Sequence, residues 1–337
     1  MERRQRVTIS EVAKQAGVSK TTISRYLNGK FGFMSEESRQ RIAAVIEELD
    51  YRPNNLARSL KSCKSRLLGV IIADITSPFS AILVKGITDC SKDYGYHVMI
   101  ATTDNNPEKE QEYILSMLDQ RVEGLIVNTT CKNNAFLLEV AKQYVPIILA
   151  DRPTFPTLFD TVRTTDYTST LELMAGLKAR QYEKVAFFSE PLNEVGTRIL
   201  RLQAYEQACR EILHQEPWKA IVAMEDEALI EQEILAFLAG AEGKKAIFTP
   251  NGVALLQVLK AMKRLDLSVP AAAGVCGFDN WDWAELVGPG ITAIDQPSYD
   301  VGAACVKRMM FRLQNDRKAP PKIMELPNRI IFRGSTE

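Results

Sequence analysis

Four side chains that donate hydrogen bonds, two of them cationic, stand within six residues near the N-terminus: Lys20, Thr21, Thr22 and Arg25. On a helix these side chains point away from Ile23 and Leu27, whose apolar groups need a core on the other side. Hydroxyl, ammonium and guanidinium groups are donors that proteins use on DNA phosphates and on base edges in the major groove. The spacing therefore predicts a helix face suited to DNA recognition.

Two short helices joined by a tight turn are needed to position this face. Ser10 is predicted to cap the first helix and Ser19 the second, and Gly17 stands in the turn, where a positive φ is required. This pattern is a helix-turn-helix, whose second helix fits the major groove. A helix pair from an enzyme is the alternative, but it does not explain a cationic face directly after an Ala-Gly-Val-Ser turn.

The net charge is distributed unevenly along the chain. Residues 1–66 contain 14 Lys and Arg against 7 Asp and Glu, which gives +7, and the remainder carries −7 because the whole chain sums to zero. A basic head on an acidic body is expected when only the head meets phosphates. Basic N-terminal segments are common, but here the charge coincides with the helix pair.

The composition argues against several classes of protein. Of the 337 residues 46% are hydrophobic and 25% charged, as in a globular protein with a small head and larger domains. Apolar runs have strand length, and no secretory leader or membrane span is recognised, so a cytoplasmic, nucleoid-associated protein without a membrane partner is expected. Six scattered cysteines and only two histidines argue against structural zinc and indicate a reduced compartment.

A third helix and a short hinge segment complete the head. Ser35 to Ser38 have the spacing of a capping box, and apolar positions follow at helical spacing. Pro53 ends this third helix, and Asn54 can cap a further helix of barely two turns. So short a helix is unstable alone in water, and it is expected to form only against another subunit or DNA.

The head resembles that of the lac repressor/galactose repressor family, including the hinge signature Tyr-x-Pro-Asn-x-x-Ala-Arg-x-Leu that begins at Tyr51. The resemblance covers nearly the whole chain and implies a homodimeric transcription regulator that binds a near-palindromic operator. In that family two hinge helices pair in the minor groove, and a leucine from each wedges between base pairs. The matching wedge residue is Leu60, with basic neighbours Arg58 and Lys61.

The resemblance also assigns contacts on the DNA. The base-reading positions of the family fall on Lys20, Thr21 and Arg25, of which the two cations suit guanine O6 and N7. Other polar residues are better placed for phosphate contacts, which set register without reading sequence. These are Thr8, Ser19, Thr22, Ser24, Asn28 and Asn54.

From residue 67 onward, short apolar strands alternate with amphipathic helices, which indicates parallel sheets with helices on both faces. About 270 residues are too many for one such sheet, so we predict two doubly wound subdomains with a cleft between them. Helices are expected to include Glu108–Gln120, Thr197–Leu213 and Val253–Arg264. Strands are expected at Leu68–Ala73, His97–Ala101, Gly124–Val127, Pro146–Ala150, Val185–Ser189, Ala220–Met224, Ala246–Thr249, Gly274–Phe278 and Thr292–Asp295.

The predicted organisation has three parts. An all-α helix-turn-helix head spans 1–53, and a hinge helix and linker span 54–65. An α/β body like that of periplasmic binding proteins spans 66–337 and serves effector binding and dimerisation. Its N-subdomain is expected at about 66–164 plus 296–326, and its C-subdomain at about 165–295.

Ligands in open α/β sheets bind beyond the carboxyl ends of the strands, and the loops there are polar and aromatic, as suits a small hydroxylated ligand. Arg201 would clamp an anionic or hydroxyl-rich group, and Asp279 would accept hydrogen bonds from sugar hydroxyls. We add two residues to the predicted site. Arg198 lies one helical turn from Arg201, and Trp281 could stack on the ring of a sugar. The resemblance places effector positions on Pro78, Phe79, Asp151, Arg201, Asn251, Asp279 and Gln296.

The two arginines on one side of the predicted effector site, Arg198 and Arg201, favour an acidic effector such as a keto-deoxy sugar acid. The alternative for Asp151 is purely structural, since an aspartate after a strand often only caps the next helix. No nucleophile elbow, Walker or dinucleotide motif is found, so neither an enzyme nor a cofactor nor a metal is expected. A periplasmic sugar-binding protein would lack the basic head.

The sequence therefore predicts a DNA-binding repressor of a carbohydrate-utilisation operon, controlled by a small sugar or sugar acid. The effector would alter subdomain closure and, through it, the pairing of the hinge helices. A catabolite-control regulator that responds to a phosphoprotein partner is the alternative. A dimer is favoured over a tetramer, because no leucine-heptad tail follows Arg333.

Overall fold

The structure is a computed structural model that describes residues 7–32, 34–51, 64–240, 242–314 and 319–337. The chain divides into two units, residues 1–65 and 66–337, called the head and the body below. Most of the hinge segment lies outside the described residues, so the roles assigned there stay predictions. This applies to Asn54, Arg58, Leu60 and Lys61.

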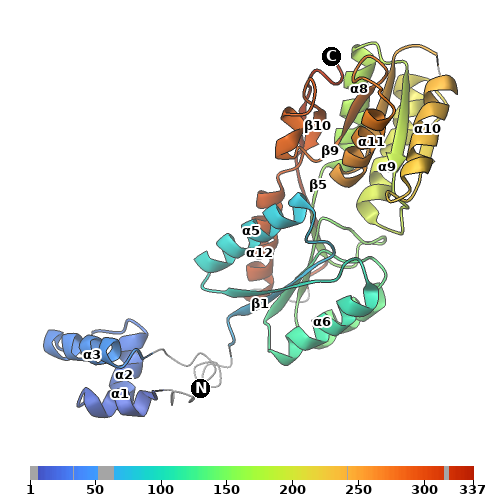
Figure 1. Cartoon of the computed structure of the whole chain (residues 1–337). Helices are drawn as coiled ribbons and strands as arrows, with labels where there is room; N and C mark the ends of the chain where they lie inside the picture. Colours follow the sequence, from blue (N-terminus) through green and yellow to red (C-terminus); the bar gives the residue numbers. More distant parts are fainter. Residues whose placement is uncertain (1–6, 33, 52–63, 241, 315–318) are drawn as a thin grey trace. The chain divides into compact units, whose positions relative to one another are not determined.

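Three helices form the head, namely α1 (Ile9–Gln15), α2 (Lys20–Leu27) and α3 (Glu36–Glu48) (Figure 1). Gly17 has a φ of +65°, as the tight turn after α1 requires. Ser19 and Ser35 cap the next two helices by accepting the Thr22 and Ser38 N–H groups at 3.1 and 3.2 Å. The core of the head comprises Val12, Ala13, Ala16, Ile23, Ile42, Val45 and Tyr51. The helix-turn-helix is confirmed.

The cap of α1 was predicted wrongly, because Thr8 and not Ser10 occupies that position. Thr8 Oγ1 accepts the Glu11 N–H at 3.4 Å, and the Glu11 carboxylate accepts the Thr8 N–H at 2.6 Å. This reciprocal capping box satisfies two otherwise unpaired donors and lowers the pKa of Glu11 through these bonds. Ser10 is an exposed residue of the first turn.

The first subdomain of the body is a parallel six-stranded sheet in the order β11-β5-β4-β3-β1-β2. Successive residues of a strand serve opposite faces. Val70 faces a core built with α5 and α12, and Ile71 faces a core built with α6 and α7. The strands are β1 (Leu67–Ile72), β2 (His97–Thr102), β3 (Gly124–Val127), β4 (Ile147–Ala150), β5 (Asp160–Thr164) and β11 (Ile323–Leu326). The helices are α5 (Pro78–Asp93), α6 (Pro107–Asp119), α7 (Asn134–Gln143) and α12 (Ser298–Gln314).

Helices α5 and α12 lie side by side over this sheet (Figure 1). Two glycines allow the close approach of their backbones. A Cβ added to Gly86 would lie 2.1 Å from the Tyr299 carbonyl oxygen, and one added to Gly302 would lie 2.2 Å from that of Leu83. Any larger residue at these two positions would force the helices apart.

The second subdomain has the strand order β12-β10-β9-β8-β6-β7, in which only β12 is antiparallel to its neighbour. Aromatic residues including Phe187 and Phe248 pack one face against α8 and α9, and α10 and α11 cover the other. The strands are β6 (Lys184–Ser189), β7 (Trp218–Ile221), β8 (Lys245–Thr249), β9 (Gly274–Phe278), β10 (Thr292–Asp295) and β12 (Arg329–Ile331). The helices are α8 (Asp166–Ala179), α9 (Gly196–Ala208), α10 (Glu227–Gly240) and α11 (Gly252–Arg264).

The sequence analysis did not predict three strands, β5, β11 and β12, because of their composition or their length. β5 reads Asp-Thr-Val-Arg-Thr, with a single large apolar residue, and β11 and β12 are edge strands of four and three residues. The strand expected at Ala220–Met224 ends earlier, at Ile221. The helix expected at Thr197–Leu213 is α9 followed by a π-helical segment, Cys209–Leu213.

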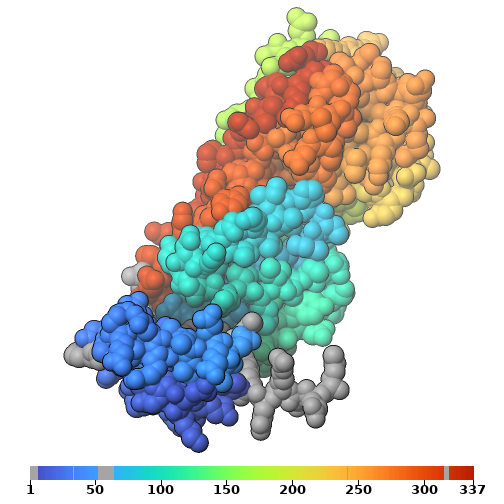
Figure 2. All heavy atoms as spheres, turned by 60° about the vertical axis from the view of Figure 1, so that its left-hand side comes forward, coloured from blue at the N-terminus to red at the C-terminus, as the bar shows by residue number. Residues whose placement is uncertain are grey.

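The chain crosses three times between the subdomains. The crossings run from β5 to α8, from β10 to α12 and from β11 to β12. Figure 2 shows the subdomains as blue-green and yellow-orange parts in contact on the face in view. Within the described part of the chain, none of the helices combines the length and the apolar character needed to cross a membrane.

Candidate functional site

The outer face of α2 is free to meet a ligand. Lys20, Thr21 and Arg25 are exposed, and none of them has a side-chain hydrogen bond or ion pair to another described residue. By contrast, Ser19 and Thr22 are tied to each other at the start of the helix, and Asn28 Nδ2 donates to the Ser24 carbonyl at 2.7 Å. The predicted base-reading residues are thus the unconstrained ones. Among the predicted phosphate-contacting residues that the structure describes, Thr8 and Ser19 are the N-caps of α1 and α2, and Asn28 is the C-cap of α2.

A cleft between the two subdomains of the body contains two adjoining cavities. The inner compartment has a volume of about 160 Å³ and lies where the polar loops after β1, β2, β3, β4, β6, β8, β9 and β10 converge, as expected for ligands of open α/β sheets. Seven of the nine predicted effector residues line it, namely Phe79, Asp151, Arg198, Arg201, Asn251, Asp279 and Gln296.

The other two predicted residues do not line this compartment. Pro78 is the first residue of α5. Trp281 packs its indole on the start of α11, where a Cβ added to Gly252 would meet the ring at 2.5 Å. Trp281 therefore supports the backbone next to Asn251, and it lines neither the inner compartment nor the adjoining cavity.

Arg201 is the centre of the inner compartment, although only 4% of it is exposed. Its Nε and Nη2 donate to Asp166 Oδ1 at 2.9 and 2.6 Å, and its Nη1 donates to the Pro250 carbonyl. Nη2 also reaches Gln296 Oε1 at 3.1 Å, and the guanidinium lies 3.7 Å from the centre of the Phe278 ring. The arginine is thus held on every side.

The network continues to Asp279 and joins two of the crossings between subdomains. Gln296 Nε2 donates to Asp279 Oδ1 at 2.6 Å, and Asp279 Oδ2 accepts the Gly252 N–H at 2.8 Å. Asp166 begins α8 just after the first crossing, and Gln296 lies in the second. The network therefore ties together two of the segments by which the chain passes from one subdomain to the other.

Three buried carboxylates surround the one Arg201 guanidinium: Asp151, Asp166 and Asp279. Burial raises the pKa of all three, and for Asp151 burial and the neighbouring Asp166 carboxylate raise it to about 7. Asp151 Oδ1 and Asp166 Oδ2 are buried and receive no hydrogen bond from any described residue. When Asp151 is ionised, the inner compartment is therefore rich in acceptors.

The raised pKa of Asp151 predicts a pH dependence of stability. Between about pH 4 and pH 7 the folded protein keeps Asp151 protonated while the unfolded chain ionises it, so the free energy of unfolding is expected to fall as pH rises through this window. Asp151→Asn should flatten that slope and be more stable than the wild type at pH 8. Urea denaturation at pH 5, 6.5 and 8 measures both effects. The exposed Asp119→Asn is the control, and an unchanged slope in Asp151→Asn would contradict the assignment.

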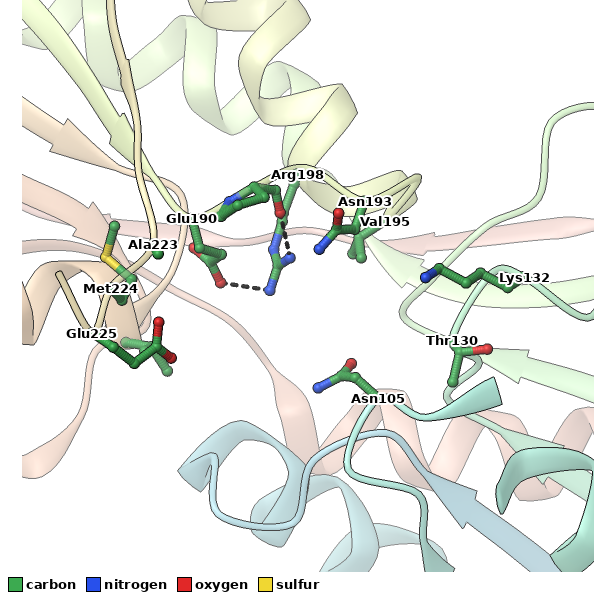
Figure 3. Close-up of a pocket in the computed structure, with 12 residues that line it drawn as sticks. Asn105, Thr130, Lys132, Glu190, Asn193, Val195, Arg198, Ala223, Met224 and Glu225 are labelled. Atoms are coloured by element: carbon green, nitrogen blue, oxygen red, sulfur yellow. Dashed lines mark hydrogen bonds and ion pairs between the residues drawn. The ribbon is translucent and has the colours of Figure 1, made fainter. Parts of the chain in front are cut away.

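The outer compartment, of about 370 Å³, adjoins the inner one and shares Asn105, Glu190 and Arg198 with it. Arg198 Nη2 pairs with Glu190 at 2.5 Å, and its Nη1 donates to the Pro191 carbonyl at 2.9 Å. Asn251 Nδ2 donates to both Glu190 oxygens at 2.8 and 3.0 Å. In Figure 3, Arg198 lies between Lys132 on one side of the pocket and Glu225 on the other.

The sequence analysis missed several residues of the cleft. It also missed Asp166, the ion-pair partner of Arg201, because this residue follows β5, whose polar sequence hid the strand. Arg152 follows Asp151 directly and donates from Nη1 to Asn105 Oδ1 and to the Thr129 carbonyl at 3.0 and 2.9 Å. The residues that no sequence signal separated from ordinary loop residues are Asn105, Asn128, Lys132, Glu190 and Thr197.

The described residues hold no group of three or more His, Cys, Asp or Glu side chains arranged to bind a metal ion. The three aspartates of the inner compartment face an arginine instead. Their arrangement suits a ligand that donates several hydrogen bonds, as the hydroxyls of a sugar do.

Two family models match the chain. Residues 8–54 match the model of bacterial regulatory proteins of the lacI family, and residues 175–336 match a periplasmic binding protein-like domain. The model for the head thus ends within the hinge segment.

Curated relatives match over almost the whole length. The HTH-type transcriptional regulator KdgR of Bacillus subtilis is 39% identical over 336 residues, and 97% of each chain is covered. The HTH-type transcriptional regulator PtxS of Pseudomonas putida is 35% identical, with 99% of this chain and 97% of the relative covered. A crystal structure of the lac repressor dimer bound to operator and the anti-inducer ONPF superposes with a TM-score of 0.85 at 24% identity, covering 98% of this chain and 99% of that one, which shows the shared fold.

Proposed function

Since the chain belongs to the lacI family and is a DNA-binding transcription regulator, we propose that it is a repressor whose operator affinity is set by a small sugar or sugar acid in the cleft. It acts as a homodimer on a near-palindromic operator of a carbohydrate-utilisation operon. The helix-turn-helices occupy adjacent major grooves, and the hinge segments enter the minor groove between them.

The exposed face of α2 supports the operator contact. Lys20 and Arg25 have no partner among the described residues and can each bond a guanine edge, and Thr21 can contact a thymine methyl group or a base edge. Thr8 and Ser19 stand at the N-termini of α1 and α2, where backbone N–H groups favour a phosphate.

The observation that carries the effector proposal is the Arg201 network. Arg201, Gln296 and Asp279 of this network line the inner compartment beside Asp151, whose buried Oδ1 has no donor among the described residues, and the network joins two crossings between subdomains. A ligand hydroxyl that donates to this oxygen binds one arrangement of the subdomains better than another. Such a difference in affinity is what a ligand needs to shift a conformational equilibrium.

An operator-binding titration with the full chain tests the proposal. Duplexes are first selected from a random pool, and near-palindromic sites are expected to be enriched. Sugars, sugar acids and sugar phosphates are then added at fixed salt, and at least one is expected to change the operator affinity. The proposal fails if no palindrome is enriched or no small molecule has an effect, and an effect only with a phosphoprotein would favour a catabolite-control regulator.

Leu60→Ala tests the part assigned to the hinge. The substitution removes the proposed apolar wedge, so operator affinity is expected to fall at least tenfold because the kinked duplex is no longer stabilised. Effector binding and the dimer's sedimentation should be unchanged. A mobility-shift titration at fixed salt measures the loss, and wild-type affinity in this variant would refute the wedge.

A further inference from the structure

The inner compartment is unsuited to an anionic group. Two buried aspartates, Asp151 and Asp279, line it beside Arg201, and the Arg201 guanidinium is already paired with a third buried aspartate, Asp166, at 2.6 Å. A carboxylate or phosphoryl group placed there would find the guanidinium already occupied and would adjoin two further acidic side chains, Asp151 and Asp279, in a poorly solvated site, where like charges repel strongly once these groups are ionised. The part of the ligand that enters it has to be neutral and rich in donors.

The outer compartment has a cation, Lys132, that forms no ion pair with a described carboxylate, although Glu225 lines the same compartment. Arg198 is neutralised by Glu190, and both side chains are less than one-fifth exposed. Lys132 is exposed, and among the described residues no carboxylate pairs with it. Figure 3 shows its amine turned toward the pocket, with Glu225 on the opposite side.

The loop that carries Lys132 is anchored on both sides of that residue. Glu110 of α6, fully buried, accepts the Thr130 N–H at 2.7 Å and an Asn133 Nδ2 hydrogen at 3.1 Å. Asn133 also donates to the Pro107 carbonyl at 2.7 Å. The backbone of Lys132 is therefore held in place before any ligand arrives, which lowers the entropy cost of binding.

The sizes of the compartments point to a ligand that extends across both. About 160 Å³ is below the 300 to 1,000 Å³ that ligand pockets usually have. The outer compartment, with about 370 Å³, lies within that range and adjoins the inner one through the residues they share.

We infer that the outer compartment is an oxyanion subsite, in which Lys132 binds the carboxylate or phosphoryl group of an effector whose hydroxylated part fills the inner compartment. This inference rests on the proposed function and adds the orientation of the ligand. In this arrangement Lys132 binds the negative charge of the effector. Arg201 and Arg198 stay paired with Asp166 and Glu190 and position the residues that line the cleft.

The test compares matched ligands on the full-length protein by calorimetry: glucose, gluconate and glucose 6-phosphate, and galactose, galactonate and galactose 6-phosphate. At least one acidic member is expected to bind ten or more times tighter than its neutral partner. Lys132→Ala should weaken that acid about tenfold, the value of one charge-assisted hydrogen bond, and leave the neutral sugar unchanged. Lys132→Arg should retain most of the affinity. Lys142→Ala, an exposed lysine of α7 outside the cleft, is the control.

Comparing the sugar acids with the sugar phosphates shows whether the bound oxyanion is a carboxylate or a phosphoryl group. Tighter binding of either class than of the neutral sugar supports the oxyanion subsite. The salt dependence of acid binding should also decrease in Lys132→Ala, because one screened charge pair is lost. Equal binding of neutral and acidic members, or an equal loss of both in Lys132→Ala, overturns the inference while the proposed function stands. If no member of the panel binds and no small molecule changes operator affinity, both fail.

Discussion

Arg201→Met is expected to lower the free energy of unfolding of the body by about 3–5 kcal/mol, the usual cost of breaking a buried ion pair. Methionine can keep an apolar contact with Phe278, so the loss reports the charge and the hydrogen bonds of the guanidinium. Without the guanidinium, three buried carboxylates face one another with no cation between them. Any effector response of operator binding should disappear as well.

Asp166→Asn is the matched control for this substitution. The amide keeps a carbonyl oxygen for Arg201, and the guanidinium still has Asp151 and Asp279 as nearby negative charges. The expected loss is below about 1.5 kcal/mol, that of one ordinary hydrogen bond. Urea denaturation compares the two variants at pH 8, above the pKa of Asp151.

The pH dependence supplies a second criterion. Lowering the pH protonates the uncompensated carboxylates of Arg201→Met, so much of the lost stability should return near pH 5. Equal losses in Arg201→Met and Asp166→Asn at pH 8, or a loss in Arg201→Met that does not shrink at low pH, would contradict the role given to the guanidinium.

The head was predictable because its signals are local. Ser19 and Gly17 stand at fixed offsets from the apolar residues of two helices, and both have the predicted roles. Two details differ: α3 ends at Glu48, before Pro53, and Thr8 caps α1 in place of Ser10, an error between two candidate caps two residues apart. The Glu11 carboxylate decides between them, since it reaches back to Thr8.

The cleft was predictable only in part because its residues come from distant loops. Asp151 and Asp279 each follow an apolar strand that the sequence reveals, and both line the inner compartment. Asp166 follows β5, a strand made up mostly of polar residues, and its hydrogen bond to Arg201 joins residues 35 positions apart. The ion pairs of Arg198 with Glu190 and of Arg201 with Asp166 likewise could not be predicted from the spacing of these residues in the sequence. These pairs nevertheless decide where an anion can bind.

The second large effect concerns the head. Lys20→Ala and Arg25→Ala are each expected to weaken specific operator binding by about 1–3 kcal/mol per subunit if each side chain reads a guanine. In the proposed dimer both half-sites are affected, so each substitution should reduce affinity by about 30-fold or more. Binding to unrelated DNA should change far less, because it depends on phosphate contacts.

Lys14→Ala is the control for charge alone. Lys14 is an exposed residue of α1, outside the recognition face, and its loss removes the same charge from the head. Anisotropy titrations on the selected operator and on a scrambled duplex, at several salt concentrations, separate the two effects. A base-reading residue changes the ratio of specific to nonspecific affinity, whereas a phosphate contact mainly lowers the salt slope by about one. If Lys20→Ala and Arg25→Ala behave like Lys14→Ala, the face of α2 contributes only charge, and another part of the chain reads the sequence.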